Sequence, residues 1–162
     1  LADDDAEAVT RLDTALASRA AAERFARMVA GLGGPADIVE RSDRYLPKAP
    51  VVRPVYAGES GHLAAMDTRA LGMAVVELGG GRRQAGAAID HAVGLSEIAA
   101  LGERVDGERP LAVVHARSEA DAERAAASLR AAMQLGEAPP PRLLIHAIVG
   151  PDGRVTEPGG YS

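Results

Sequence analysis

The chain has very few aromatic residues, and this limits the kind of core that it can build. Among 162 residues only four are aromatic, namely Phe25, Tyr45, Tyr56 and Tyr161, although 47% of the residues are hydrophobic. Aromatic side chains usually contribute the largest buried areas in a protein core. Here alanine, valine and leucine must supply the core, which therefore depends on close approach of the backbone or on a partner surface.

Charge and composition exclude several classes of protein. The formal net charge is −5, whereas a nucleic-acid binder needs a clustered excess of lysine and arginine. The sequence has no cysteine, so it forms neither disulfides nor thiolate metal sites, which is compatible with the cytosol. No apolar run approaches the roughly 18 residues that a membrane helix needs. We therefore expect a cytoplasmic protein that binds neither nucleic acid nor membrane.

The first part of the sequence has helical periodicity. Asp5 is the predicted N-cap of a helix whose apolar residues recur at helical spacing, namely Val9, Leu12 and Leu16. A second helix is predicted from the stripe of Phe25, Met28, Val29 and Leu32. The Gly-Gly-Pro run at 33–35 should end it, because proline cannot continue the hydrogen-bond ladder. One short helix could follow at 35–41, and the proline-rich stretch 45–54 favours extended backbone and a domain boundary.

Short strands and a helix alternate in the next part. Strands are predicted at 51–57, 62–66, 87–93 and 111–116. Asp67 is the predicted cap of a helix that carries Leu71, Ala74, Val75 and Leu78 on one face. Three glycines end this helix, and Asp106-Gly107 is a favoured two-residue hairpin turn. The order indicates a small, mostly antiparallel β unit.

The clearest helical pattern begins at Ser118, with Asp121 in the position of a capping-box partner. Its inward residues are predicted to be Ala122, Ala125, Leu129, Ala132 and Met133. Three prolines end the exit loop, a final strand is predicted at 143–149, and the polar tail from residue 151 should be loosely ordered. The pattern alone indicates an α+β fold.

Several segments of the sequence together resemble the C-terminal part of thymidine phosphorylases. They are residues 25–30 (FARMVA), 66–83 (MDTRALGMAVVELGGGRR), 89–94 (IDHAVG) and 105–116 (VDGERPLAVVHA), with Gly34-Pro35 and Tyr45-Leu46-Pro47 in matching order. The resemblance implies a C-terminal α/β hammerhead that follows a larger α/β domain. Residues 1–50 would be a helical segment of that larger domain, 51–150 the hammerhead-like domain and 151–162 a tail.

The resemblance also implies an activity whose key residues lie upstream of this sequence. Thymidine phosphorylases convert thymidine and phosphate to thymine and 2-deoxyribose 1-phosphate without a cofactor, typically as homodimers. Their S-G-R-containing signature is absent here. We therefore expect a truncated or trimmed piece, starting at Leu1, that supplies scaffold and domain closure to the rest of its own chain. A stand-alone binding or regulatory module and a related uridine or nucleoside-monophosphate phosphorylase stay open as alternatives.

The glycine-rich loop at 79–83 (GGGRR) could cradle a phosphate through its backbone N–H groups. Gly81 and Gly86 even have the separation of a phosphate-binding loop. However, Ala87 and Ala88 stand where lysine and serine or threonine are required, and the loop follows a predicted helix rather than a strand. The favoured interpretation is a helix C-cap and tight turn, with a contribution to packing or domain closure as the alternative.

The histidines do not have the spacing of a metal site. None of His62, His91, His115 and His146 lies three or four residues from another. Each is interpreted as a core or edge residue with one satisfied ring nitrogen. The residue types of a nucleophile triad occur in Glu59, Ser60, His62 and Asp67, but no strand-to-helix elbow surrounds Ser60.

Two other motifs are also better explained by structure than by chemistry. The predicted hairpin at 105–110 resembles the turn of biotinyl and lipoyl carrier domains, yet the lysine that carries the cofactor is missing, since the only lysine is Lys48. The acidic cluster of Asp3, Asp4, Asp5 and Glu7 fits the first turn of a helix. We therefore assign no catalytic, substrate-binding or metal-binding residue and expect no cofactor.

Overall fold

The computed structural model describes residues 4–140 and 147–156. The chain divides into two compact units, Leu1–Pro47 and Lys48–Ser162. Helices and antiparallel strands both occur, so the predicted α+β class is confirmed. The assignment of residues 1–50 to a larger domain stays a prediction.

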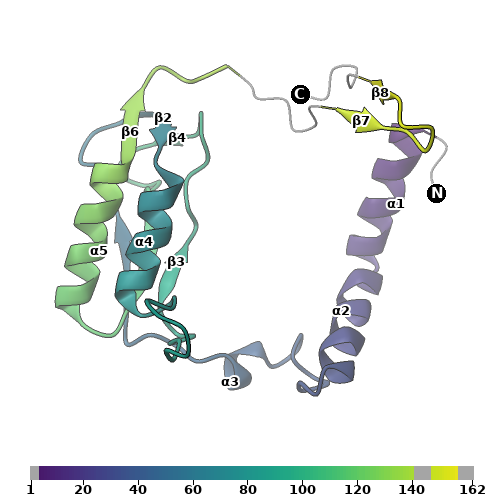
Figure 1. Ribbon diagram of the computed structural model, residues 1–162, viewed down its shortest axis with the longest axis horizontal. Coiled ribbons are helices and arrows are strands. Elements are labelled where there is room, and N and C mark those ends of the chain that lie inside the picture. The colour runs from purple at the N-terminus through teal and green to yellow at the C-terminus, as the bar shows by residue number, and fades with distance from the viewer. Residues whose placement is uncertain (1–3, 141–146, 157–162) are drawn as a thin grey trace. The chain divides into compact units, whose positions relative to one another are not determined.

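The first unit contains the helices α1 (Asp5–Ala17), α2 (Ala20–Gly31) and α3 (Ser42–Tyr45) (Figure 1). Asp4, and not the predicted Asp5, is the N-cap of α1, because its side chain accepts the N–H of Glu7 at 2.8 Å. α2 ends where the glycines predicted it, and Gly33 has the left-handed φ of 87°. Leu32 lies just outside the helix.

The short helix predicted at 35–41 is wrong in its position. Residues 36–40 form turns, and the helical turn follows as α3. The hydroxyl of Tyr45 donates to Asp37 Oδ1 at 2.7 Å, and the N–H of Arg41 donates to the Asp37 carbonyl at 2.9 Å. Asp37 therefore holds a turn at the place where the sequence pattern favoured a helix.

Many large apolar side chains of the first unit lie at its surface. In and next to α1 and α2, six of them have between 50% and 82% of their surface exposed, namely Val9, Leu12, Leu16, Phe25, Met28 and Leu32. No residue of α2 is buried. The amphipathic pattern therefore forms the predicted helices, but these helices build no core among the described residues.

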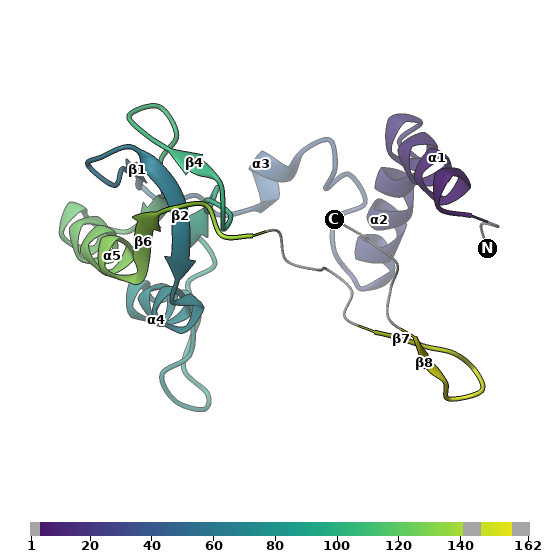
Figure 2. The ribbon, with the colours of Figure 1, turned by 90° about the horizontal axis from the view of Figure 1, so that it is seen from above.

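The second unit has two three-stranded antiparallel sheets. The β5-centred sheet has the order β1-β5-β3, with strands Val51–Val55, Ala112–Ala116 and Gly94–Ser96. The β2-centred sheet has the order β4-β2-β6, with strands Arg104–Val105, Gly61–Met66 and Met133–Gly136. Figure 2 shows β6 beside β2, and Figure 1 shows the helices α4 (Thr68–Leu78) and α5 (Glu119–Ala132) side by side.

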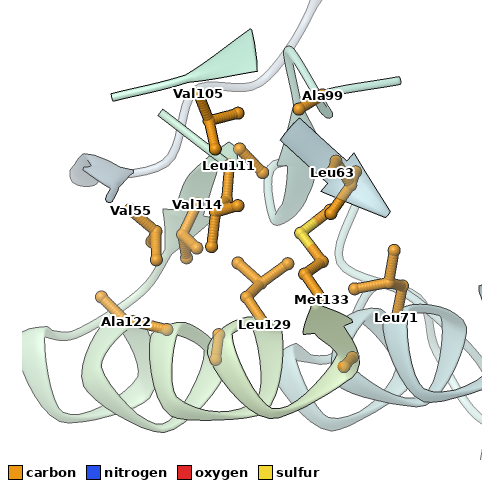
Figure 3. Close-up of a cluster of buried hydrophobic side chains, with 14 of the residues drawn as sticks. Val55, Leu63, Leu71, Ala99, Val105, Leu111, Val114, Ala122, Leu129 and Met133 are labelled. Atoms are coloured by element: carbon orange, nitrogen blue, oxygen red, sulfur yellow. The ribbon is translucent and has the colours of Figure 1, made fainter. Parts of the chain in front are cut away.

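Small aliphatic side chains fill the core of the second unit, as the composition predicts. Its largest fully buried side chains are Leu63, Leu111, Leu129, Val55, Val105 and Val114. In Figure 3 these side chains point into the space between the two helices and the strands. The five residues predicted to face inward from α5 and its end are all buried. No aromatic side chain belongs to this core in the described part of the chain.

The strand predicted at 87–93 is absent from the structure, and β3 begins at Gly94. Ala92 and Val93 are buried, but other contacts hold them: Asp90 Oδ1 accepts the N–H of Ala92 at 3.0 Å. The apolar run therefore reflects burial and not strand pairing. Conversely, Met133 was expected to end a helix but begins β6, because it pairs with Met66 of β2.

The hairpin predicted at Asp106-Gly107 is also wrong. β4 pairs with β2, whereas β5 pairs with β1 and β3, so the segments on either side of this turn belong to different sheets. Gly107 has no positive φ. The turn is made by the side chain of Asp106, whose Oδ1 accepts the N–H groups of Glu108 and Arg109 at 2.9 and 3.0 Å.

The tail is more ordered than expected. β7 (Ile148–Val149) and β8 (Val155–Thr156) form an antiparallel pair, so the prediction of a loose tail is wrong for 151–156. The N–H of Gly150 donates to the Arg154 carbonyl at 2.9 Å and closes the turn, in which Gly153 has a φ of 76°. Of the strand predicted at 143–149, residues 143–146 lie outside the described residues, and so does the tail beyond Thr156.

Candidate functional site

The glycine-rich loop is the end of a well-defined helix. Asp67 caps α4 as predicted, because its Oδ1 accepts the N–H of Ala70 at 2.9 Å, and Leu71 and Ala74 bury one face of the helix. At the other end Gly79 has a φ of 99°, the left-handed conformation that favours glycine. Sequence, cap and burial therefore place the loop at the C-terminal end of α4.

The first two N–H groups of the loop are already used by the helix. The N–H of Gly79 donates to the Val76 carbonyl at 3.1 Å, and that of Gly80 to the Val75 carbonyl at 2.9 Å. These bonds satisfy carbonyls that an unfinished helix end would leave free. A phosphate cradle needs such N–H groups to point at the ligand. The interpretation as a helix C-cap is therefore confirmed for Gly79 and Gly80.

The second and third glycines allow close packing. A Cβ on Gly80 would lie 2.9 Å from Val75 Cγ1 and 3.1 Å from the Val93 carbonyl oxygen, and one on Gly81 would lie 2.6 Å from Val76 Cγ2. These separations are shorter than atoms tolerate in a packed interior. The loop can therefore lie against α4 and the segment before β3 only if these positions lack side chains.

Asp90 connects this loop to the opposite helix. Its N–H donates to the Gly79 carbonyl at 2.9 Å, and its carboxylate forms a bidentate ion pair with Arg117, at 2.6 Å from Nε and 2.8 Å from Nη2. Arg117 follows β5 and precedes Ser118, the N-cap of α5. The hydrogen bonds from Arg117 and from the N–H of Ala92 lower the pKa of Asp90 to about 2. The C-terminal end of α4 is thereby tied to the N-terminal end of α5.

The two arginines of the loop point into solvent. Arg82 and Arg83 are exposed, and neither forms an ion pair within the part of the chain that the structure describes. Arg83 lines an open surface hollow of about 510 Å³ together with Glu77, Gln84, Ala87 and Ala88. The walls of this hollow are side chains at the surface, so the arrangement does not enclose a ligand.

The region with this geometry matches a known family. Residues 62–136 match the family model of the pyrimidine nucleoside phosphorylase C-terminal domain. The match runs from β2 to the end of β6 and contains α4, the glycine-rich loop, the Asp90–Arg117 ion pair and α5. The resemblance of this part of the chain to the C-terminal part of the pyrimidine nucleoside phosphorylases is thus confirmed.

The histidines of the described residues are not brought together. Nδ1 of His62 in the β2-centred sheet donates to the Gly102 carbonyl at 3.0 Å, whereas Nε2 of His115 in the β5-centred sheet lies 2.8 Å from Ser96 Oγ. Both have one satisfied ring nitrogen, as predicted, but His91 is exposed in a turn. His146 lies outside the described residues. No group of three or more potential metal ligands occurs among the described residues.

The residue types of the nucleophile triad are also separated. Glu59 and Ser60 are exposed in the loop before β2, and His62 lies near the start of that strand. Asp67 follows the end of the same strand, which places it roughly 16 Å from His62 at the usual rise per residue. Its carboxylate caps α4. The four residues therefore form no common site.

The acidic cluster at the N-terminus also has structural contacts. Asp4 caps α1, and Glu7 forms an ion pair with Arg11 at 2.5 Å. Asp3 lies outside the described residues. None of the helices in the described ranges has both the length and the apolar composition needed to cross a membrane.

The sequence reasoning identified the loop but missed its connection to α5. Asp90 was noticed only as part of the family-like run, and Arg117 was not singled out at all. The two residues are 27 positions apart, and no periodic pattern relates them. Only the packing of α4 against α5 brings them together.

Proposed function

We propose that this chain is the C-terminal part of a thymidine phosphorylase, which converts thymidine and phosphate to thymine and 2-deoxyribose 1-phosphate. The observation that carries the proposal is the match of residues 62–136 to the C-terminal domain of the pyrimidine nucleoside phosphorylases. In this reaction phosphate attacks the anomeric carbon while the bond to the base breaks. The complete enzyme must hold phosphate in line and stabilise charge on the departing base.

Within that enzyme we assign this chain the role of scaffold and domain closure. Two features support the assignment. The N–H groups of Gly79 and Gly80 are bonded to α4, and His62 and His115 lie in different sheets with separate hydrogen-bond partners. The ion pair between Asp90 and Arg117 stiffens the domain across its two helices. A rigid domain suits a movement that closes a cleft over two substrates.

The partner of the helical unit is, in this proposal, the rest of the same phosphorylase chain. α1 and α2 leave Leu12, Leu16, Phe25 and Met28 at least half exposed. Helices at the surface of a folded protein rarely expose large apolar side chains at so many positions. Covering these side chains would supply the core that the unit lacks among the described residues. The complete enzyme is further proposed to be a cytoplasmic homodimer.

Two alternatives remain. The complete enzyme could act on uridine or nucleoside monophosphates instead of thymidine, or the chain could be a stand-alone binding or regulatory module instead of part of an enzyme. Both are compatible with the match of residues 62–136, since the family description covers pyrimidine nucleosides in general. Substrate choice in this proposal depends on residues upstream of the matched domain.

The test is phosphate-dependent release of base from thymidine and, in parallel, from uridine. The purified chain is compared with the same chain fused behind the N-terminal region of a characterised thymidine phosphorylase. We expect no release by the chain alone and thymine release by the fusion. Release by the chain alone would overturn the scaffold role, and a soluble fusion that binds thymidine but cannot turn it over would favour the stand-alone module.

A further inference from the structure

A serine and a histidine are hydrogen-bonded on the outer face of the β5-centred sheet. Ser96 Oγ lies 2.8 Å from His115 Nε2. The register explains the contact: Ser96 is opposite Val113, and Gly94, which has no side chain, is directly opposite His115, so the imidazole ring can reach the Ser96 hydroxyl. Both residues are half-buried and therefore partly open to solvent.

The outward positions of the three strands around this pair carry uncharged side chains. Val114 and Ala116 point into the core, so His115 and Val113 occupy the opposite face of the sheet. On the same face β1 contributes Val52, which is 56% exposed, and Pro54. Among the outward positions of these three strands no ionised side chain competes for the hydroxyl or the ring. An apolar acyl group could lie on this surface next to the hydroxyl.

The backbone after the serine has an unusual conformation. Glu97 has a φ of 52°, although it is not glycine, and its carbonyl accepts a hydrogen bond from Arg109 Nη1 at 3.0 Å. Left-handed residues other than glycine are uncommon and are held in place by the surrounding structure. Arg109 thus fixes the point where β3 ends, and with it the position of Ser96.

We propose that Ser96, with His115 as its base, is an acyl-acceptor site for activated esters of short apolar acids. In the reaction Ser96 Oγ attacks the carbonyl carbon of the ester and its proton passes to His115 Nε2. The new Oγ–C bond forms as the bond to the leaving alkoxide or aryloxide breaks, and no oxidant or metal is required. A hydroxyl within hydrogen-bond reach of a base is the usual arrangement of an activated nucleophile.

The geometry also limits this chemistry to a single transfer. No carboxylate is hydrogen-bonded to the Nδ1 of His115 in the described ranges, so the ring lacks the third group that orients a full triad. We therefore expect stoichiometric acylation without rapid turnover. This site is independent of nucleoside phosphorolysis, since it requires neither phosphate nor a nucleobase.

The experiment is acetylation of the whole chain by p-nitrophenyl acetate, followed over time by peptide mass spectrometry. Ser60 is the internal control, because it is exposed in a loop of the same molecule. General-base assistance contributes about 100-fold or more, so Ser96 should be acetylated about 100-fold faster than Ser60 in the wild-type protein. His115→Gln should reduce the rate at Ser96 to that of Ser60, whereas His91→Gln, at an exposed histidine, should leave it unchanged.

Two results would overturn the proposal. One is acetylation of Ser96 and Ser60 at rates within about threefold of each other, which means that the imidazole gives no assistance. The other is an unchanged rate at Ser96 in a folded His115→Gln protein. The first comparison is made within the wild-type chain, so it stays decisive if the substitution prevents folding.

Discussion

Asp90 and Arg117 form a bidentate ion pair between the loop after α4 and the start of α5, with separations of 2.6 and 2.8 Å. Asp90 also accepts the N–H of Ala92, and its own N–H is bonded to the carbonyl of Gly79. One aspartate therefore organises the end of a helix, the approach to β3 and the beginning of the second helix.

We predict that Arg117→Ala lowers the melting temperature of the chain, because the substitution leaves a partly buried carboxylate without its cation. Arg41→Ala is the matched control, since Arg41 forms a longer ion pair of 3.7 Å with Asp37 on the surface of the first unit. Calorimetry of both variants checks the prediction. Equal melting temperatures for the two variants would mean that the Asp90–Arg117 pair does not stabilise the fold.

The same pair should make stability depend on pH in the acid range. The pKa of Asp90 falls from 3.8 to about 2 on folding, so the folded state binds this proton less readily than the unfolded state. The stabilisation is complete above about pH 3.8, declines as the pH falls towards 2 and is lost below that value. Denaturant unfolding of wild type and Asp90→Asn between pH 2 and 6 measures it. A difference between the two proteins that stays constant across this range would contradict the prediction.

Gly80→Val should destabilise the domain by about 1–3 kcal/mol, which is the usual cost of overpacking. Its Cβ would lie 2.9 Å from Val75 Cγ1 and 3.1 Å from a backbone oxygen. Gly81→Val is expected to act in the same direction. In a complete enzyme we expect the loss in folding or closure, and a changed phosphate affinity with unaltered stability would contradict this interpretation.

A glycine inside α4 should give the opposite result. Gly72 is exposed, and a Cβ there would meet no atom within 4 Å. Gly72→Ala should therefore stabilise the chain by about 0.5–1 kcal/mol, the difference in helix propensity. Urea unfolding of Gly72→Ala and Gly80→Val measures whether the free energy of unfolding rises in the first variant and falls in the second. A destabilised Gly72→Ala would show that α4 has a neighbour at this face.

Leu129→Ala should destabilise the second unit by about 2–5 kcal/mol, because Leu129 is fully buried at the centre of the core. Leu12→Ala, at a residue that is 64% exposed, should change the stability of the chain by less than about 0.5 kcal/mol. In the fusion with the upstream region, Leu12→Ala should become destabilising. If it stays neutral there, the helical unit does not pack through this side chain.

The sequence was informative where local chemistry decides the structure. The caps at Asp67 and Ser118, the left-handed Gly79 and the inward face of α5 all follow from residue types at short spacing. It was less informative where distant segments compete for pairing. Met133 begins a strand because β2 offers a partner, whereas Ala92 and Val93 are buried without strand pairing, next to Asp90, which accepts the N–H of Ala92.

The candidate sites show the same division. The glycine-rich loop could be recognised as a helix end because three glycines follow a predicted helix, and the absence of lysine and serine or threonine after Gly86 excluded a nucleotide-binding loop. The Ser96–His115 contact could not be recognised, because it depends on the register between β3 and β5. Strand register is set by the whole sheet and is not visible within one segment.

The register of β2 with β6 pairs His62 with Gly136, and these two residues are also the first and last residues of the family match. The two ends of the matched segment therefore lie next to each other on neighbouring strands of the β2-centred sheet. Such an arrangement allows a domain to be transferred between chains as one piece, since a host needs only one point of attachment. β1 lies before the match but pairs with β5 inside it, so a transferred piece should begin at Lys48.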